Sequence, residues 1–130
     1  KRYRIMKSYL NFDVTINDAI AKKGTSRERT TKNSQHFKGR ALDLNVVSFT
    51  DDQKLQLLDA ASKAGFTSFG FGKTILHADW GGGYRRWSYP GTPKTWGGVP
   101  LGKLFKWVRP GKGVKEAGSA FKLLKNAITE

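Results

Sequence analysis

The chain contains no cysteine, and this absence limits the chemistry open to it. None of its 130 residues is Cys, so it can form neither a disulfide nor a structural zinc site closed by thiolates. No apolar run approaches the roughly 20 residues that span a bilayer, and no charged start followed by an apolar segment marks a signal peptide. The sequence therefore predicts a soluble protein with no signal peptide and no transmembrane segment in this chain.

Acidic residues are also scarce. Asp and Glu number 10 against 24 Lys and Arg, which gives a formal net charge of +14. This balance predicts attraction to a polyanion, and nucleic acid, anionic lipid and the phosphate-bearing polymers of bacterial envelopes all qualify. A length of 130 residues predicts one domain with one core, and a hydrophobic share of 38% is ordinary for a globular protein rather than a disordered one.

Histidine is the third scarce residue, because only His36 and His77 occur. Asp43 follows His36, and Gly39 between them lets the backbone turn. Two imidazoles and one carboxylate make a three-ligand zinc set that leaves a fourth position for water. That arrangement is typical of a catalytic zinc site rather than a structural one.

These residues form a motif that resembles a known family. The motif positions are Ser34-x-His36-x-x-Gly39-x-Ala41-x-Asp43, followed downstream by His77-x-Asp79. They resemble the zinc peptidases of the D-alanyl-D-alanine carboxypeptidase group, which includes VanY-like carboxypeptidases and phage endolysin peptidases and shares its fold with the hedgehog signalling domain. The likeness covers about residues 14–96. It implies that His36, Asp43 and His77 bind one zinc ion per chain.

Alternating polar and apolar residues predict four short strands. They are Phe12–Asn17, Arg40–Phe49, Phe66–Gly72 and Thr74–Trp80. The alternation points Leu42 and Leu44 into the core and Asp43 to the opposite face, and it makes His77 and Asp79 project together. A helix is expected between Thr50 and Gly65. Thr50 and Gln53 have the spacing of a capping box at its start, and Gly65 is a good helix stop.

The expected fold class is therefore α+β, with a small antiparallel sheet and a covering helix, and the resemblance implies a hedgehog-type peptidase fold. Residues 1–99 are expected to form the zinc peptidase domain and 100–130 a basic C-terminal extension packed on it. Apolar residues at helical spacing from Val114 to Ile128, with lysines largely opposite, predict a basic amphipathic helix there. Such a helix either packs on the domain or binds a membrane or an anionic polymer.

Two segments are expected to be loops. Residues 18–33 are polar and basic, which suits either a functional loop or a solvated surface loop. Tyr84–Trp96 is rich in glycine, proline and aromatics and should form a surface loop without regular structure. The large aromatic residues of this part of the chain either line a groove beside the metal or close one end of the core; they are Trp80, Trp87, Tyr89 and Trp96.

The catalytic groups are assigned with two alternatives. Asp79 is the candidate general base, because it projects from the same strand face as His77, and the alternative is that it orients His77 or pairs with an arginine. Some relatives carry an acid three residues before the final histidine, where this chain has Thr74. They also carry an arginine before the first motif, for which Arg29 is the candidate. The candidate substrate-binding residues are Ser34, Trp80, Tyr84 and Trp87.

The resulting hypothesis is a monomeric zinc peptidase that cuts the peptide part of bacterial peptidoglycan. Its positive charge fits anionic cell-wall polymers, and it would act in the cell envelope or be released at lysis, as a phage or a bacterial enzyme. An endopeptidase needs a groove open at both ends, and the glycines Gly81 to Gly83 with the aromatic segment after them suit one wall of such a groove. This favours endopeptidase action slightly over D-alanyl-D-alanine carboxypeptidase action. The alternatives are a non-enzymatic zinc-binding domain that binds a partner and a basic nucleic-acid-binding module with incidental histidines, although specific nucleic-acid binding is not expected.

Overall fold

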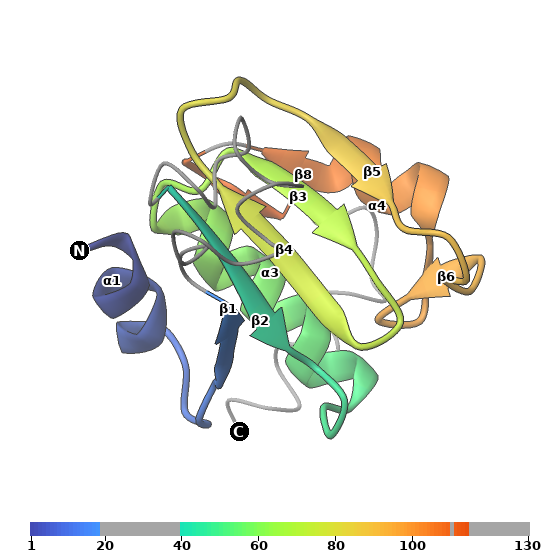
Figure 1. Cartoon of the computed structure of the whole chain (residues 1–130), viewed down its shortest axis with the longest axis horizontal. Coiled ribbons are helices and arrows are strands. Elements are labelled where there is room, and N and C mark those ends of the chain that lie inside the picture. The colour runs from blue at the N-terminus through green and yellow to red at the C-terminus, as the bar shows by residue number, and fades with distance from the viewer. Residues whose placement is uncertain (19–39, 110, 115–130) are drawn as a thin grey trace, which may run out of the picture.

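A mixed five-stranded sheet lies at the centre of the computed structural model, which describes residues 1–18, 40–109 and 111–114 (Figure 1). In spatial order its strands are β1 (Ile16–Asp18), β2 (Ala41–Asn45), β4 (Ile75–Asp79), β3 (Ser68–Phe71) and β5 (Arg86–Ser88). Neighbouring strands are antiparallel except β3 and β5, which are parallel. The α+β class predicted from the sequence is confirmed at this coarse level.

Helix α3 (Asp51–Lys63) covers one face of the sheet and lies behind it in Figure 1. Its start is the predicted capping box: the Thr50 hydroxyl accepts from the Gln53 amide N–H at 3.2 Å, and the Gln53 side chain accepts from the Thr50 N–H at 3.0 Å. Gly65 follows the helix with φ +103°, a backbone conformation that favours glycine. Both predicted helix ends are therefore confirmed.

Strand alternation divides the sheet into two chemically different faces, as predicted. The side chains that pack with α3 in the core are Leu42, Leu44, Phe69, Phe71, Leu76 and Ala78. Asp43 and His77 alternate with these residues in the sequence and Asp79 follows Ala78, so all three project from the opposite face. The functional candidates thus lie on a rigid sheet, on the side away from α3.

The chain beyond the sheet adds to the same core. Helix α4 (Leu101–Trp107) is flanked by two short hairpins, β6 (Thr95–Trp96) with β7 (Val99–Pro100) and β8 (Val108–Arg109) with β9 (Gly113–Val114). Leu104, Val108 and Val114 are all buried in the core. The Val114 amide N–H donates to Asp59 of α3 at 2.9 Å. Of the predicted basic helix, residues 115–130 lie outside the described residues.

Two local predictions were wrong, and one helix was not predicted. The expected loop Tyr84–Trp96 contains β5 and β6, and β5 makes the sheet mixed rather than antiparallel; strands this short carry too little alternation to be read from the sequence. The basic start of the chain forms α1 (Arg2–Ser8), which buries Met6. The first strand begins at Ile16 rather than Phe12, whose ring instead packs edge-on against Phe49.

None of the helices in the described ranges is long and apolar enough to cross a bilayer.

Candidate functional site

A single row of residues crosses four strands on the polar face of the sheet. Asp43 of β2 is paired with His77 of β4, His77 with Gly70 of β3, and Gly70 with Trp87 of β5. Residues paired directly across a sheet have neighbouring side chains on the same face. Two residues that are far apart in the sequence, Asp43 and His77, are thereby held side by side by backbone pairing.

The His77 imidazole lies in a line between two carboxylates. Its Nδ1 is 3.1 Å from Asp43 Oδ1, and its Nε2 is 2.7 Å from Asp79 Oδ2. His77 and Asp79 are buried, with 6% and 0% of their surface exposed. We call these three residues the carboxylate–imidazole line. The predicted projection of His77 and Asp79 from one strand face is confirmed by their contact.

Opposing effects act on the pKa of His77. Burial lowers it, but the hydrogen bonds and negative charges of Asp43 and Asp79 outweigh burial, so the pKa of His77 is raised from its ordinary value. The physical cause is that the charged imidazolium can donate to a carboxylate from each nitrogen. The two carboxylates would likewise favour a metal cation that takes the place of the proton on one imidazole nitrogen.

Asp79 is committed to neighbours within the protein. Its Oδ2 contacts both His77 and, at 3.5 Å, the guanidinium of Arg85. Its Oδ1 is buried and has no hydrogen-bond partner among the described residues. Of the two roles considered for Asp79, these contacts favour orientation of His77 and pairing with an arginine over that of a general base, because a base needs access to the reacting water.

Trp87 covers one side of the site because Gly70 leaves room for it. A Cβ atom built on Gly70 would lie 2.6 Å from the indole ring of Trp87, a distance that no real Cβ tolerates. The Trp87 ring therefore crosses the backbone of β3 and reaches His77, with ring centroids 5.1 Å apart. Tyr89 continues this aromatic wall, with its centroid 6.0 Å from that of Trp87.

Tyr89 is part of the electrostatic environment of the site. Burial, followed by the negative charge of Asp43, raises the pKa of Tyr89 to about 12. A phenol with this pKa stays neutral at physiological pH, so its hydroxyl remains a hydrogen-bond donor. Arg85, Trp87 and Tyr89 are two residues apart along β5 and its ends, which places all three on the face that carries His77.

The residues present fit a zinc site as far as they are described. Asp43 and His77 provide a carboxylate oxygen and an imidazole nitrogen that face each other, and Asp79 holds the other imidazole nitrogen, as in carboxylate–histidine–zinc triads. Within residues 1–18, 40–109 and 111–114 no three acidic or histidine side chains surround one point. Asp79 lies behind the imidazole, and the third expected ligand, His36, lies outside the described residues.

The other predicted site residues are placed as follows. Trp80 is on the core side of the sheet, where it packs edge-on against Phe66 at 5.3 Å and lies under Arg2. Trp96 is also in the core, 97% of it being buried. Tyr84 is exposed at the start of the segment leading to β5. The structure brings Trp87 and Tyr89 to His77 but not Trp80 or Trp96, whereas Arg29 and Ser34 lie outside the described residues.

Arg85 lies at the site but was not predicted from the sequence. Its signal was the alternation Arg85, Trp87, Tyr89 within a segment interpreted as irregular because of its glycine and proline content. Once β5 is recognised as a strand, the same alternation places Arg85 beside Asp79. The missing information was the pairing partner of β5, which only the folded sheet supplies.

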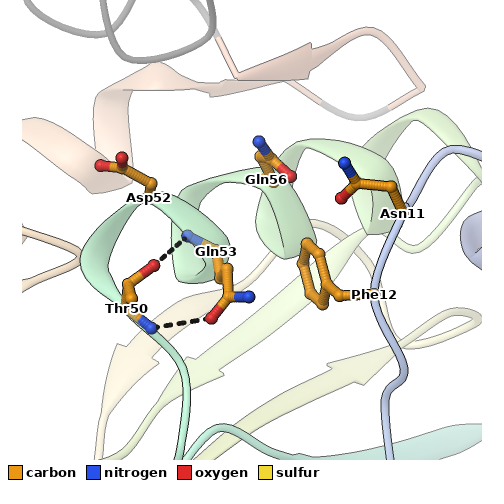
Figure 2. A pocket seen from close by; sticks show the side chains of 6 residues that line it. All are labelled: Asn11, Phe12, Thr50, Asp52, Gln53 and Gln56. Carbon is orange, nitrogen blue, oxygen red and sulfur yellow. Dashed lines mark hydrogen bonds between the residues drawn. The ribbon is translucent and has the colours of Figure 1, made fainter. Parts of the chain in front are cut away.

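A separate hollow of about 390 Å³ lies on the α3 side of the sheet, away from His77 (Figure 2). The residues lining it are Asn11, Phe12, Thr50, Asp52, Gln53 and Gln56. Thr50 and Gln53 are bonded to each other in the capping box, so their hydrogen-bonding groups are largely used by the helix start. The hollow contains none of the expected catalytic residues.

Comparisons with protein-family models, with curated proteins and with solved structures found no match to this chain.

Proposed function

We propose that this protein is a zinc-dependent peptidase that hydrolyses the peptide part of bacterial peptidoglycan. The observation that carries the proposal is the carboxylate–imidazole line on the face of the sheet away from α3. Its Asp43 and His77 are two of the three residues that the motif resemblance implies as zinc ligands. Their adjacency in the sheet supports the proposal because nothing in their sequence separation requires it.

In this proposal His36, Asp43 and His77 hold the metal, with His77 contributing the nitrogen that faces Asp43. Bound zinc would supply a Lewis acid and lower the pKa of a water molecule to about 7. Asp79 fixes the tautomer of His77 by accepting from Nε2–H, and its burial keeps that bond free from competition with water. Trp87 packs against the imidazole and limits its rotation.

The strongly positive charge supports a polyanionic partner, for which we propose the anionic polymers of the bacterial cell wall. The envelope, or the medium after lysis, is the corresponding place of action. A non-enzymatic zinc domain and a nucleic-acid-binding module are the competing functions. Zinc analysis combined with digestion of peptidoglycan separates both from a peptidase.

The test combines zinc analysis with digestion of purified peptidoglycan. We expect about one zinc per chain, release of peptide fragments from the wall, and loss of that release with a chelator and its return with added zinc. His77→Ala should lose both zinc and activity, whereas Tyr9→Ala, which alters an exposed aromatic residue of the same chain, should keep both. Stoichiometric zinc without any cleavage would indicate the non-enzymatic domain, and absence of zinc binding would overturn the proposal.

A further inference from the structure

Arg85 directly precedes β5 and reaches the carboxylate–imidazole line, where its contact with Asp79 leaves most of its guanidinium unused. Its NH2 nitrogen lies 3.5 Å from Asp79 Oδ2, the same oxygen that His77 contacts at 2.7 Å. Because both groups meet one oxygen atom, the guanidinium lies within a few ångströms of the His77 ring. A ligand group bound to Arg85 is therefore also close to His77.

The backbone of Arg85 is held rigidly. Its N–H donates to Ser68 Oγ and its carbonyl accepts from the Phe69 N–H, both at 2.9 Å. Two bonds to β3 fix where the side chain begins, and the guanidinium lies over the Trp87 ring at 5.4 Å from the centroid. Groups on rigid elements bind ligands more accurately than groups on loops.

The guanidinium itself has spare donors. Arginine has five N–H donors, and among the described residues the Arg85 side chain has Asp79 as its hydrogen-bond acceptor, at the long distance of 3.5 Å. The side chain is 55% exposed. It is therefore accessible beside a buried site, with a planar fork of donors that matches the two oxygens of a carboxylate.

Its neighbour Arg86 shows the contrast. Arg86 points to the other side of the strand, where NH2 donates to the Val108 carbonyl at 2.8 Å, and burial lowers the pKa of its guanidinium. Arg86 thus joins β5 to the β8–β9 hairpin and has a structural role. Of the two adjacent arginines, Arg85 is the one available to a ligand.

We infer that Arg85 binds a carboxylate of the peptide substrate and places the adjoining peptide bond at His77. This inference rests on the proposed peptidase function and deepens it. A peptidoglycan stem peptide has two sources of this group, the C-terminal carboxylate and the free carboxylate of its D-glutamate. The first would make the enzyme a carboxypeptidase, and the second would suit cleavage within the stem.

The test uses three synthetic lysine-type stem peptides: one with both carboxylates free, one amidated at the C-terminus and one amidated at D-glutamate. For the wild-type protein, we expect one of the two amidations to lower kcat/KM by roughly ten- to a hundredfold, mainly through KM, as for loss of a hydrogen bond to a charged group. Arg85→Ala should have a low kcat/KM on the peptide with both carboxylates free, and that amidation should not lower it further. Arg85→Lys should recover part of the preference, because it keeps the charge but loses the fork.

Arg4→Ala is the matched control, since it removes one exposed positive charge far from His77 along the sequence and should keep the preference. The zinc content of Arg85→Ala shows whether Arg85 binds the substrate or only holds Asp79 in place. Loss of zinc would show that Arg85 acts through Asp79 and would overturn the inference. Equal kcat/KM for all three peptides would overturn it as well.

Failure of the peptidase proposal is distinguishable from failure of this inference. If the wild-type protein cleaves no peptide, calorimetric binding of the three intact peptides still tests Arg85. Preferential binding of a free carboxylate that disappears in Arg85→Ala would support the carboxylate site by itself, and equal binding of all three peptides would exclude it.

Discussion

At the scale of single residues, the chemistry depends on what surrounds one histidine. His77 has a carboxylate on each side, and each carboxylate has a different accessibility: Asp43 retains 15% of its side-chain surface and Asp79 only 1%. The more accessible carboxylate suits a ligand for a metal, and the buried one suits a partner that orients the ring. This difference arises from position in the sheet, since both residues are aspartates.

Asp79→Asn tests this division of roles. We expect the variant to fold but to bind zinc roughly ten- to a hundredfold more weakly, because the amide is a poorer acceptor for the His77 N–H. Competition with a chromogenic chelator measures the affinity. Asp13→Asn, which removes an exposed negative charge, should bind zinc as the wild type does. Unchanged zinc affinity together with a hundredfold or greater loss of turnover would instead identify Asp79 as the general base.

At the scale of secondary-structure elements, β3 determines how close β5 comes to the site. Gly70 lies between His77 and Trp87 in the sheet, and its missing side chain is the space that the indole occupies. Helix α3 has the complementary role on the other face, where it supplies Leu55, Leu57 and Leu58 to the core. The sheet can therefore keep polar groups on one face without losing its support.

Gly70→Ala should displace Trp87 from His77. The added methyl would overlap the indole, so we expect a loss of about 1–3 kcal/mol in the free energy of unfolding, as for overpacked cores, and a clear fall in activity. Urea unfolding followed by tryptophan fluorescence measures the first effect, and peptide release from cell walls the second.

Gly102→Ala is the control for that substitution. Gly102 lies in α4 with nothing within 4 Å of an added Cβ, so alanine should be neutral or stabilise by up to about 1 kcal/mol through helix propensity. An equal loss of stability in both variants would show that the contact with Trp87 is not the cause.

At the scale of the whole molecule, the net charge of +14 produces a long-range positive field. Part of this charge is exposed on the segment that follows the sheet, at Lys103, Lys106, Arg109 and Lys112. Further positive charge is exposed near the start of the chain at Lys1, Arg4 and Lys7. Attraction to an anionic polymer can thus come from the net charge of the whole molecule or from one of these two groups of exposed basic residues.

Association with purified anionic cell wall should weaken steeply as salt rises towards roughly 1 M, where the screening length is only about 3 Å. Sedimentation with wall fragments measures it. The triple variants Lys103→Glu/Lys106→Glu/Lys112→Glu and Lys1→Glu/Arg4→Glu/Lys7→Glu change charge equally. Equal loss of binding would indicate a general field, and a greater loss in the first variant would locate the contact beyond the sheet. Binding that does not depend on salt would contradict an electrostatic attraction.

The sequence by itself determined the local features. The capping box at Thr50 and the stop at Gly65 depend on neighbours three or fewer residues away, and strand alternation sets the side of the sheet on which Asp43, His77 and Asp79 project. These features follow from backbone periodicity and from hydrogen bonds within one turn, so a linear pattern is enough to predict them.

Only the tertiary structure decided which side chains meet. Pairing of β2 with β4 places Asp43 against His77, and parallel pairing of β5 with β3 brings Arg85 and Trp87 to the site. The folded chain also packs Trp80 against the core and buries Trp96 in it, although the sequence suited a groove equally well for both. The physical reason is that strand order and register are set by burial of the whole apolar face at once, a quantity that no short stretch of sequence contains.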